Sequence, residues 1–142
     1  MARAYARDCA ARLLYARALG GDPIDDKSDI LKAGLAEGEE APGLDGGDKA
    51  YIAAMLDGVG ETLDELDDWV EQYAVGWALE RISKVDLSVL RLALFEMLHR
   101  EDIPVNVSIS EAVGLCNRFS TPESAAFVNG ILGSVSRRLE EQ

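Results

Sequence analysis

The side chains that most often perform catalysis are scarce in this chain of 142 residues. Its one histidine is His99, and its two cysteines, Cys9 and Cys116, stand among apolar neighbours without a CxxC spacing. Neither a Cys/His dyad nor a multi-histidine metal site is credible with this set, and two buried thiols in a reducing cytoplasm are the simplest interpretation. The phosphate-binding motifs and the GxSxG motif of hydrolases are absent from the sequence. The sequence therefore predicts a protein that is not an enzyme and holds no metal.

A different chemistry is suggested by the run Phe127-Val128-Asn129-Gly130 near the C-terminus. Asn129 and Gly130 are poor helix formers within a stretch of helical apolar spacing. One interpretation is packing, in which Gly130 lets another helix come close and Asn129 binds a neighbouring backbone group. The other is that Phe127 and Asn129 project outward, where aromatic and amide groups stack on and hydrogen-bond to unpaired bases. The residues alone favour packing and leave RNA binding as the alternative.

The charge of the chain is strongly acidic and unevenly spread. The net charge is −12, which argues against a general nucleic-acid binder. Residues 1–21 carry four arginines and one aspartate, a net of +3, whereas residues 22–80 carry three lysines and seventeen acids, a net of −14. Residues 81–142 carry seven cations and eight acids. A polyanion would therefore meet the two ends of the chain, and the middle suits either a basic protein partner or a solvated acidic face.

Helices are expected to position these groups in the N-terminal half. Apolar residues recur at helical spacing over residues 3–19, and a weaker helix is predicted over residues 29–37. A flexible acidic loop follows near residues 38–47. Asp48 is predicted as the N-cap of the next helix, and Gly58 marks its end.

The second half has clearer helix boundaries. A helix is predicted from Thr62, and Trp77 begins a short connecting turn. Residues 108–111 fit a capping box, and Thr121-Pro122 places a cap before a proline at the first helical position. No alternating strand pattern occurs anywhere in the sequence. The predicted fold class is all-α, with six or seven helices.

The helix predicted over residues 85–99 is apolar nearly all round and should lie at the centre of the fold. It is too short to cross a bilayer, and arginines interrupt the apolar runs at the N-terminus, so we expect a soluble cytoplasmic protein and no membrane contact. Its charges, Asp86, Arg91 and Glu96, need partners. Arg91 and Glu96 should each find a partner on another helix, and Asp86 suits the helix start while still reaching the surface.

Seven short stretches of the chain together form a recognisable pattern. They are ARDCA at 6–10, LY at 14–15, VD at 85–86, VLRLA at 89–93 with Glu96, IP at 103–104, ISEAV at 109–113 and ESAAFVNGIL at 123–132. In these stretches the chain resembles the NusB transcription antitermination family. The resemblance runs from end to end, is strongest over residues 77–132 and is weakest over residues 22–48.

This resemblance implies one all-helical domain over residues 1–142, made of two packed helical bundles around the central helix. It also implies binding of the boxA element of ribosomal RNA leader transcripts together with NusE, a ribosomal protein of the small subunit. That complex helps RNA polymerase to pass termination signals, and the family has no enzymatic activity and no cofactor.

Site residues follow from the resemblance position by position. The RNA-facing positions of the family are Arg3, Arg7, Glu123 and Phe127 here, with Asn129 as a neighbour. The sequence departs from the family at its start, because Arg3 and Arg7 are separated by three uncharged residues where family members often have a dense arginine run. Fewer phosphate contacts imply weaker RNA binding by the protein alone.

Tyr15 and Asp86 match positions linked to the NusE-bound face. We therefore expect RNA affinity to depend on this basic partner. The alternative is a helical protein–protein scaffold with little RNA binding, in which the small apolar residues of the first helix pack against a second copy in a homodimer.

Overall fold

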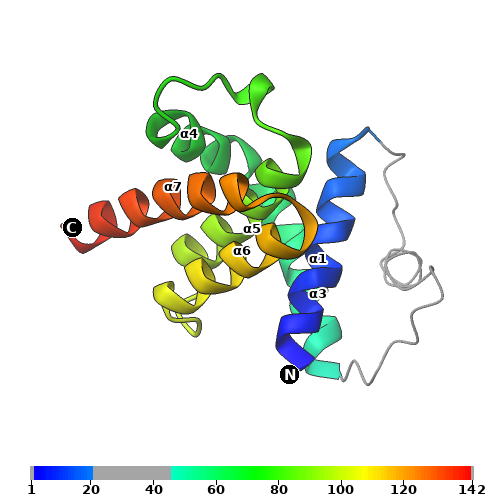
Figure 1. Ribbon diagram of the computed structural model, residues 1–142. Coiled ribbons are helices and arrows are strands. Elements are labelled where there is room, and N and C mark those ends of the chain that lie inside the picture. Colours follow the sequence, from blue (N-terminus) through cyan, green and yellow to red (C-terminus); the bar gives the residue numbers. More distant parts are fainter. Residues whose placement is uncertain (1, 21–45, 142) are drawn as a thin grey trace.

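The computed structural model describes residues 2–20 and 46–141. These residues form α1 (Ala2–Ala18), α3 (Gly46–Glu61), α4 (Leu63–Tyr73), the 3-10 helix η1 (Leu79–Arg81), α5 (Lys84–His99), α6 (Val105–Phe119) and α7 (Pro122–Glu140) (Figure 1). No strand occurs in the described ranges, and the predicted all-α class is confirmed. The helix predicted over residues 29–37 lies outside them, as do residues 38–45 of the loop predicted over residues 38–47. The last two residues of that predicted loop belong to α3 instead. None of the described helices is long and apolar enough to cross a membrane.

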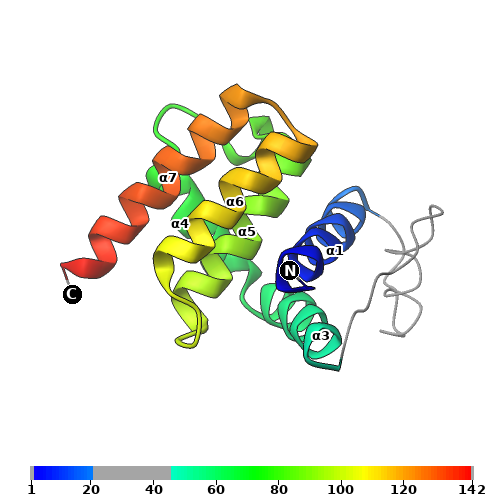
Figure 2. The same ribbon diagram turned by 60° about the horizontal axis from the view of Figure 1, so that its bottom comes forward.

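Helix α5 is the centre of the fold. It contacts α1, α3, α4, α6 and α7, and ten of its sixteen residues are buried. Figure 2 shows α1 and α3 paired on one side of α5, with α4, α6 and α7 on the other. The predicted arrangement of two helical bundles around a buried central helix is therefore confirmed.

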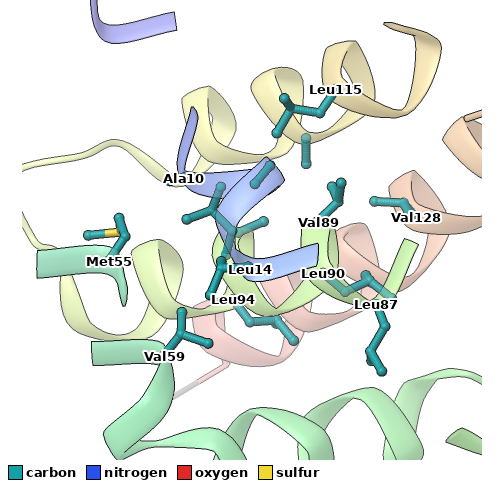
Figure 3. Packing of buried hydrophobic residues seen from close by; sticks show 14 of the residues in the cluster. Ala10, Leu14, Met55, Val59, Leu87, Val89, Leu90, Leu94, Leu115 and Val128 are labelled. Atoms are coloured by element: carbon teal, nitrogen blue, oxygen red, sulfur yellow. The ribbon is translucent and has the colours of Figure 1, made fainter. Parts of the chain in front are cut away.

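The core lies where α5 meets these neighbours. Each buried leucine or valine contributes about 2 kcal/mol through removal of its apolar surface from water. Figure 3 shows side chains from five helices meeting there, namely Leu87, Val89, Leu90 and Leu94 of α5, Ala10 and Leu14 of α1, Met55 and Val59 of α3, Leu115 of α6 and Val128 of α7.

The small residues of α1 pack against other helices of the same chain. Ala6 and Ala10 have no exposed surface, and Cys9 is 2% exposed, because α1 packs against α3 and α5. These three residues, which the homodimer alternative would place against a second copy, are therefore covered by the protein's own helices, whereas Ala16 is exposed.

Side-chain caps begin two of the helices, and the one at Thr121 was predicted. Ser83 caps α5, where its hydroxyl accepts a hydrogen bond of 3.1 Å from the backbone N–H of Asp86. Thr121 caps α7 in the same way, with a bond of 3.0 Å from the N–H of Ser124, and Pro122 takes the first helical position. The prediction of a capping box at residues 108–111 is wrong, because α6 already begins at Val105.

The boundaries predicted for α3 are also wrong. The helix begins at Gly46, so Asp48 lies in its first turn rather than at the N-cap, and it continues through Gly58 to Glu61. Gly58 serves packing instead. A Cβ atom there would lie 2.5 Å from Cε1 of Phe95 on α5 and still closer to Cζ, so only glycine allows the two helices to approach this closely.

Replacing Gly58 with alanine is expected to lower the free energy of unfolding by about 1–3 kcal/mol, because the Phe95 ring must move out of its place. Gly130→Ala is the control, since no atom lies within 4 Å of a Cβ added at Gly130. It should raise the free energy of unfolding by up to about 1 kcal/mol through helix propensity. Urea unfolding measures both, and equal effects would contradict the close packing of α3 on α5.

Candidate functional site

A buried polar cluster joins four helices around Glu96 of α5, which is 1% exposed. Nε of Arg7 on α1 lies 3.0 Å from Oε2 of Glu96, and its Nη2 lies 3.2 Å from Oε1. The hydroxyl of Ser108 on α6 donates to Oε1 at 2.8 Å, and the phenol of Tyr51 on α3 donates to Oε2. The prediction that Glu96 finds its partner on another helix is confirmed.

The electrostatics of this cluster keep Arg7 charged. Burial by itself lowers the pKa of Arg7, but the hydrogen bond and the negative charge of Glu96 outweigh it, so the pKa lies above its ordinary value. The guanidinium also lies 5.6 Å from the centre of the Tyr51 ring. Arg7 is 4% exposed, which corrects its expected place on an RNA-facing surface. A guanidinium bound to a buried carboxylate is not free for a phosphate.

The other two charges of α5 are also paired. Arg91 forms a two-pronged contact with Asp67 of α4, with N–O distances of 2.8 and 2.9 Å, which confirms the predicted partner on another helix. Asp86 accepts hydrogen bonds from Ser120 at 3.0 Å and from Ser124 at 2.7 Å. It is 7% exposed, so the expectation that its carboxylate reaches the surface is wrong. The two serine hydroxyls at the corner between α6 and α7 therefore donate to both carboxylate oxygens of Asp86.

The free thiols are buried, as expected. Both Cys9 and Cys116 are covered, and no group of residues in the described ranges has the makings of a metal site. Burial, with a smaller contribution from the charge of Asp86, raises the pKa of Cys116 to about 12. Such a thiol stays protonated and unreactive at neutral pH.

An apolar pocket of about 310 Å³ opens between α1, the start of α5 and the end of α6. Tyr15 and Phe119 line this pocket, and each residue is 37% exposed. The guanidinium of Arg12 lies 5.2 Å from the centre of the Phe119 ring. The remaining lining residues are Ala11, Val85, Ser88 and Val89. Sequence reasoning found Tyr15 but missed Arg12 and Phe119, because only the fold brings the end of α6 beside α1.

The N-terminal half of α7 carries the other predicted residues. Glu123 and Asn129 are exposed, and Phe127 is half-buried. The Phe127 ring lies 5.7 Å from the ring of Trp77, with an angle of 63° between the two planes. Gly130 is exposed and meets no neighbouring helix, so its packing interpretation is wrong. The side chain of Arg3 lies outside the described part of the structure.

Comparison with known proteins decides the family. A model described as NusB family matches residues 4–137 of the chain. The chain belongs to the NusB family. The transcription antitermination protein NusB of Acetivibrio thermocellus is 40% identical over 135 residues, which cover 95% of this chain and 88% of the relative. That of Natranaerobius thermophilus is 36% identical over 143 residues, covering 99% of each.

Solved structures agree with this assignment. A NusB structure from T. maritima is 34% identical, with a TM-score of 0.80, and covers 95% of this chain and 90% of its own. A crystal structure of the antitermination factors NusB and NusE in complex with dsRNA contains a chain that is 22% identical, with a TM-score of 0.80 and coverages of 96% and 97%. This second likeness is one of fold. The resemblance to the NusB family drawn from the sequence motifs is thus confirmed.

Removing the buried cation of this NusB-family protein should cost far more than removing an exposed one. Arg7→Gln leaves the buried carboxyl group of Glu96 without its guanidinium partner, and should lower the free energy of unfolding by about 3–5 kcal/mol. Arg118→Gln is the matched control, because Arg118 pairs with Asp8 at 2.5 Å but is 45% exposed in its side chain. Its cost should stay below about 1 kcal/mol. Similar costs in urea unfolding would contradict the structural role of Arg7.

Proposed function

We propose that this protein acts in transcription antitermination by binding the boxA element of ribosomal RNA leader transcripts together with NusE, as part of the antitermination complex of RNA polymerase. The observation that carries the proposal is the NusB family match over residues 4–137. Curated relatives of this length are named transcription antitermination proteins. A solved complex of a NusB with NusE and dsRNA contains a chain of the same fold.

The RNA face in this proposal is the N-terminal half of α7. Glu123, Phe127 and Asn129 lie within two turns of one helix, and none of them is buried. In this proposal the half-exposed ring of Phe127 stacks on an unpaired base, and the exposed amide of Asn129 hydrogen-bonds to a base edge. Arg3 remains a proposed phosphate contact at the start of α1. Arg7 is a positioning residue, because it locks α1 to α5 through Glu96.

The partner face in this proposal is the pocket between α1, α5 and α6. It offers Tyr15 and Phe119, two partly exposed aromatic rings, around an apolar recess. Aromatic residues at the edge of a pocket often dominate the binding energy of an interface. Asp86 supports this face from beneath, because it binds Ser120, the residue next to Phe119.

Alanine at Tyr15 should weaken NusE binding by about tenfold or more, since a partly buried ring at the centre of an interface is removed. Leu19→Ala is the control, because Leu19 is 60% exposed, lies just beyond the end of α1 and does not line the pocket. It should change the affinity for NusE less than about twofold. Calorimetric titration of purified NusE measures both variants. Equal effects of the two substitutions would place the partner elsewhere.

The net charge of −12 predicts that the partner supplies much of the RNA affinity. BoxA RNA should bind at least about tenfold more tightly in the presence of NusE, a scrambled RNA of equal length should gain much less, and both affinities should fall as salt rises. Fluorescence anisotropy with labelled RNA at two salt concentrations provides the measurement. Absence of any preference for boxA, with or without NusE, would overturn the proposed function.

A further inference from the structure

Trp77 is an unusually exposed aromatic residue in this protein. It lies in the connection between α4 and η1, where Gly76, with a φ of +85°, turns the chain after α4 (Figure 1). Trp77 is 52% exposed as a residue, against 37% for Tyr15 and Phe119. Half of this large aromatic residue is therefore open to water and accessible to a ligand.

The contact of Trp77 with Phe127 leaves aromatic surface open. The two planes meet at 63°, so the rings are not stacked face to face. Trp69 differs, because it is stacked on Tyr73 at 12° and is only partly exposed. Trp77 therefore joins the proposed RNA face of α7 at Phe127 and enlarges it by a ring whose stacking surface is not used up within the described residues.

Two cations follow Trp77 closely in the chain. Arg81 and Lys84 are exposed, and neither has an ion-pair partner among the described residues. Lys49 and Arg137 are likewise exposed without an ion pair in the described ranges, and Arg81 and Lys84 differ from them by their place shortly after Trp77. Carboxylates pair with five arginines elsewhere in the described ranges, which are Arg7, Arg91, Arg100, Arg118 and Arg138. A surface that carries both cations and exposed aromatic rings is typical of proteins that bind single-stranded nucleic acid.

We propose that the connection between α4 and α5 is a second part of the RNA site, in which the indole of Trp77 stacks on an unpaired base and Arg81 and Lys84 bind the adjoining phosphates. The inference rests on the proposed function and extends the site from α7 to this segment. Charge favours RNA over a protein here. A protein drawn to the acidic surface of this chain would be basic, and Arg81 and Lys84 would repel it.

Tryptophan fluorescence tests the stacking directly. The chain has two tryptophans, so Trp69→Phe leaves Trp77 as the only one. Addition of boxA RNA with NusE, which should itself be the tryptophan-free form, is expected to quench this emission, because a stacked base quenches an indole. An RNA-saturated complex with unchanged emission of Trp77 would overturn the proposal.

Binding by variants of the full chain tests the contribution of each group. Trp77→Ala should weaken boxA binding by about 5- to 100-fold, and Trp77→Phe should restore most of it, because a ring is retained. Val75→Ala is the control, since Val75 is 87% exposed in the same connection and has no ring. The thermal unfolding of each variant verifies that it is folded. An equal reduction in Val75→Ala and Trp77→Ala would overturn the role of the indole.

The cations are tested through the salt dependence of binding. Arg81→Gln with Lys84→Gln should reduce the slope of log affinity against log salt by about 1.4, because each single-strand phosphate that a cation neutralises adds about 0.7 to the slope. Arg137→Gln with Arg138→Gln, at the opposite end of α7, should leave the slope unchanged. Equal slopes in the wild type and in the Arg81/Lys84 variant would overturn the assignment of these two cations to phosphates.

The outcomes separate this inference from the proposed function. If the wild-type chain prefers boxA but the Trp77 and Arg81/Lys84 variants bind like it, the inference fails and the proposed function stands. If the wild-type chain has no preference for boxA, the proposed function fails first. If Trp77→Ala weakens NusE binding while RNA binding is unchanged, the surface is a protein contact and the inference is wrong.

Discussion

The structure depends on one buried carboxylate. Glu96 lies in the middle of the fold on the central helix and binds Arg7, Tyr51 and Ser108, which come from three other helices. A buried charge is costly unless its oxygens are fully hydrogen-bonded and its cation is close. Glu96 meets both conditions only when α1, α3 and α6 take their positions together. This requirement favours a single packing of the N-terminal pair of helices against the rest.

A second carboxylate organises the functional end of the molecule. Asp86 lies in the first turn of the central helix and accepts hydrogen bonds from Ser120 and Ser124 on either side of the α6–α7 corner. Phe119, at the pocket, precedes the first of these serines, and Glu123, on the outer face of α7, precedes the second. The proposed partner face and the proposed RNA face therefore meet at the α6–α7 corner, which the buried Asp86 carboxylate stabilises through its two hydrogen bonds. This proximity gives a physical basis for RNA affinity that depends on the partner.

The cations of the protein fall into those that stabilise the fold and those that are exposed to a ligand. The arginines that stabilise the fold are neutralised by carboxylates, as Arg91 is by Asp67 and Arg7 by Glu96. Arg81 and Lys84, two of the exposed cations that lack such partners in the described ranges, follow the exposed ring of Trp77 in the chain. An acidic protein binds a polyanion only through local surfaces of this kind, because its overall field is repulsive.

Patterns within single helices were enough to predict the all-helical class, the central position of α5, the cap of α7 at Thr121 and the family. Local sequence determines these features, through the spacing of apolar residues and the residue types in the first turn of a helix. The same patterns did not predict the roles of Arg7, Asp86, Gly58 and Ser108. Arg7 lies beside the apolar stripe of its helix, and only Glu96, 89 residues away in the chain, draws it into the core. Partners distant in sequence determine whether a polar group is buried, so the tertiary structure alone decided which charges hold the fold and which face outward.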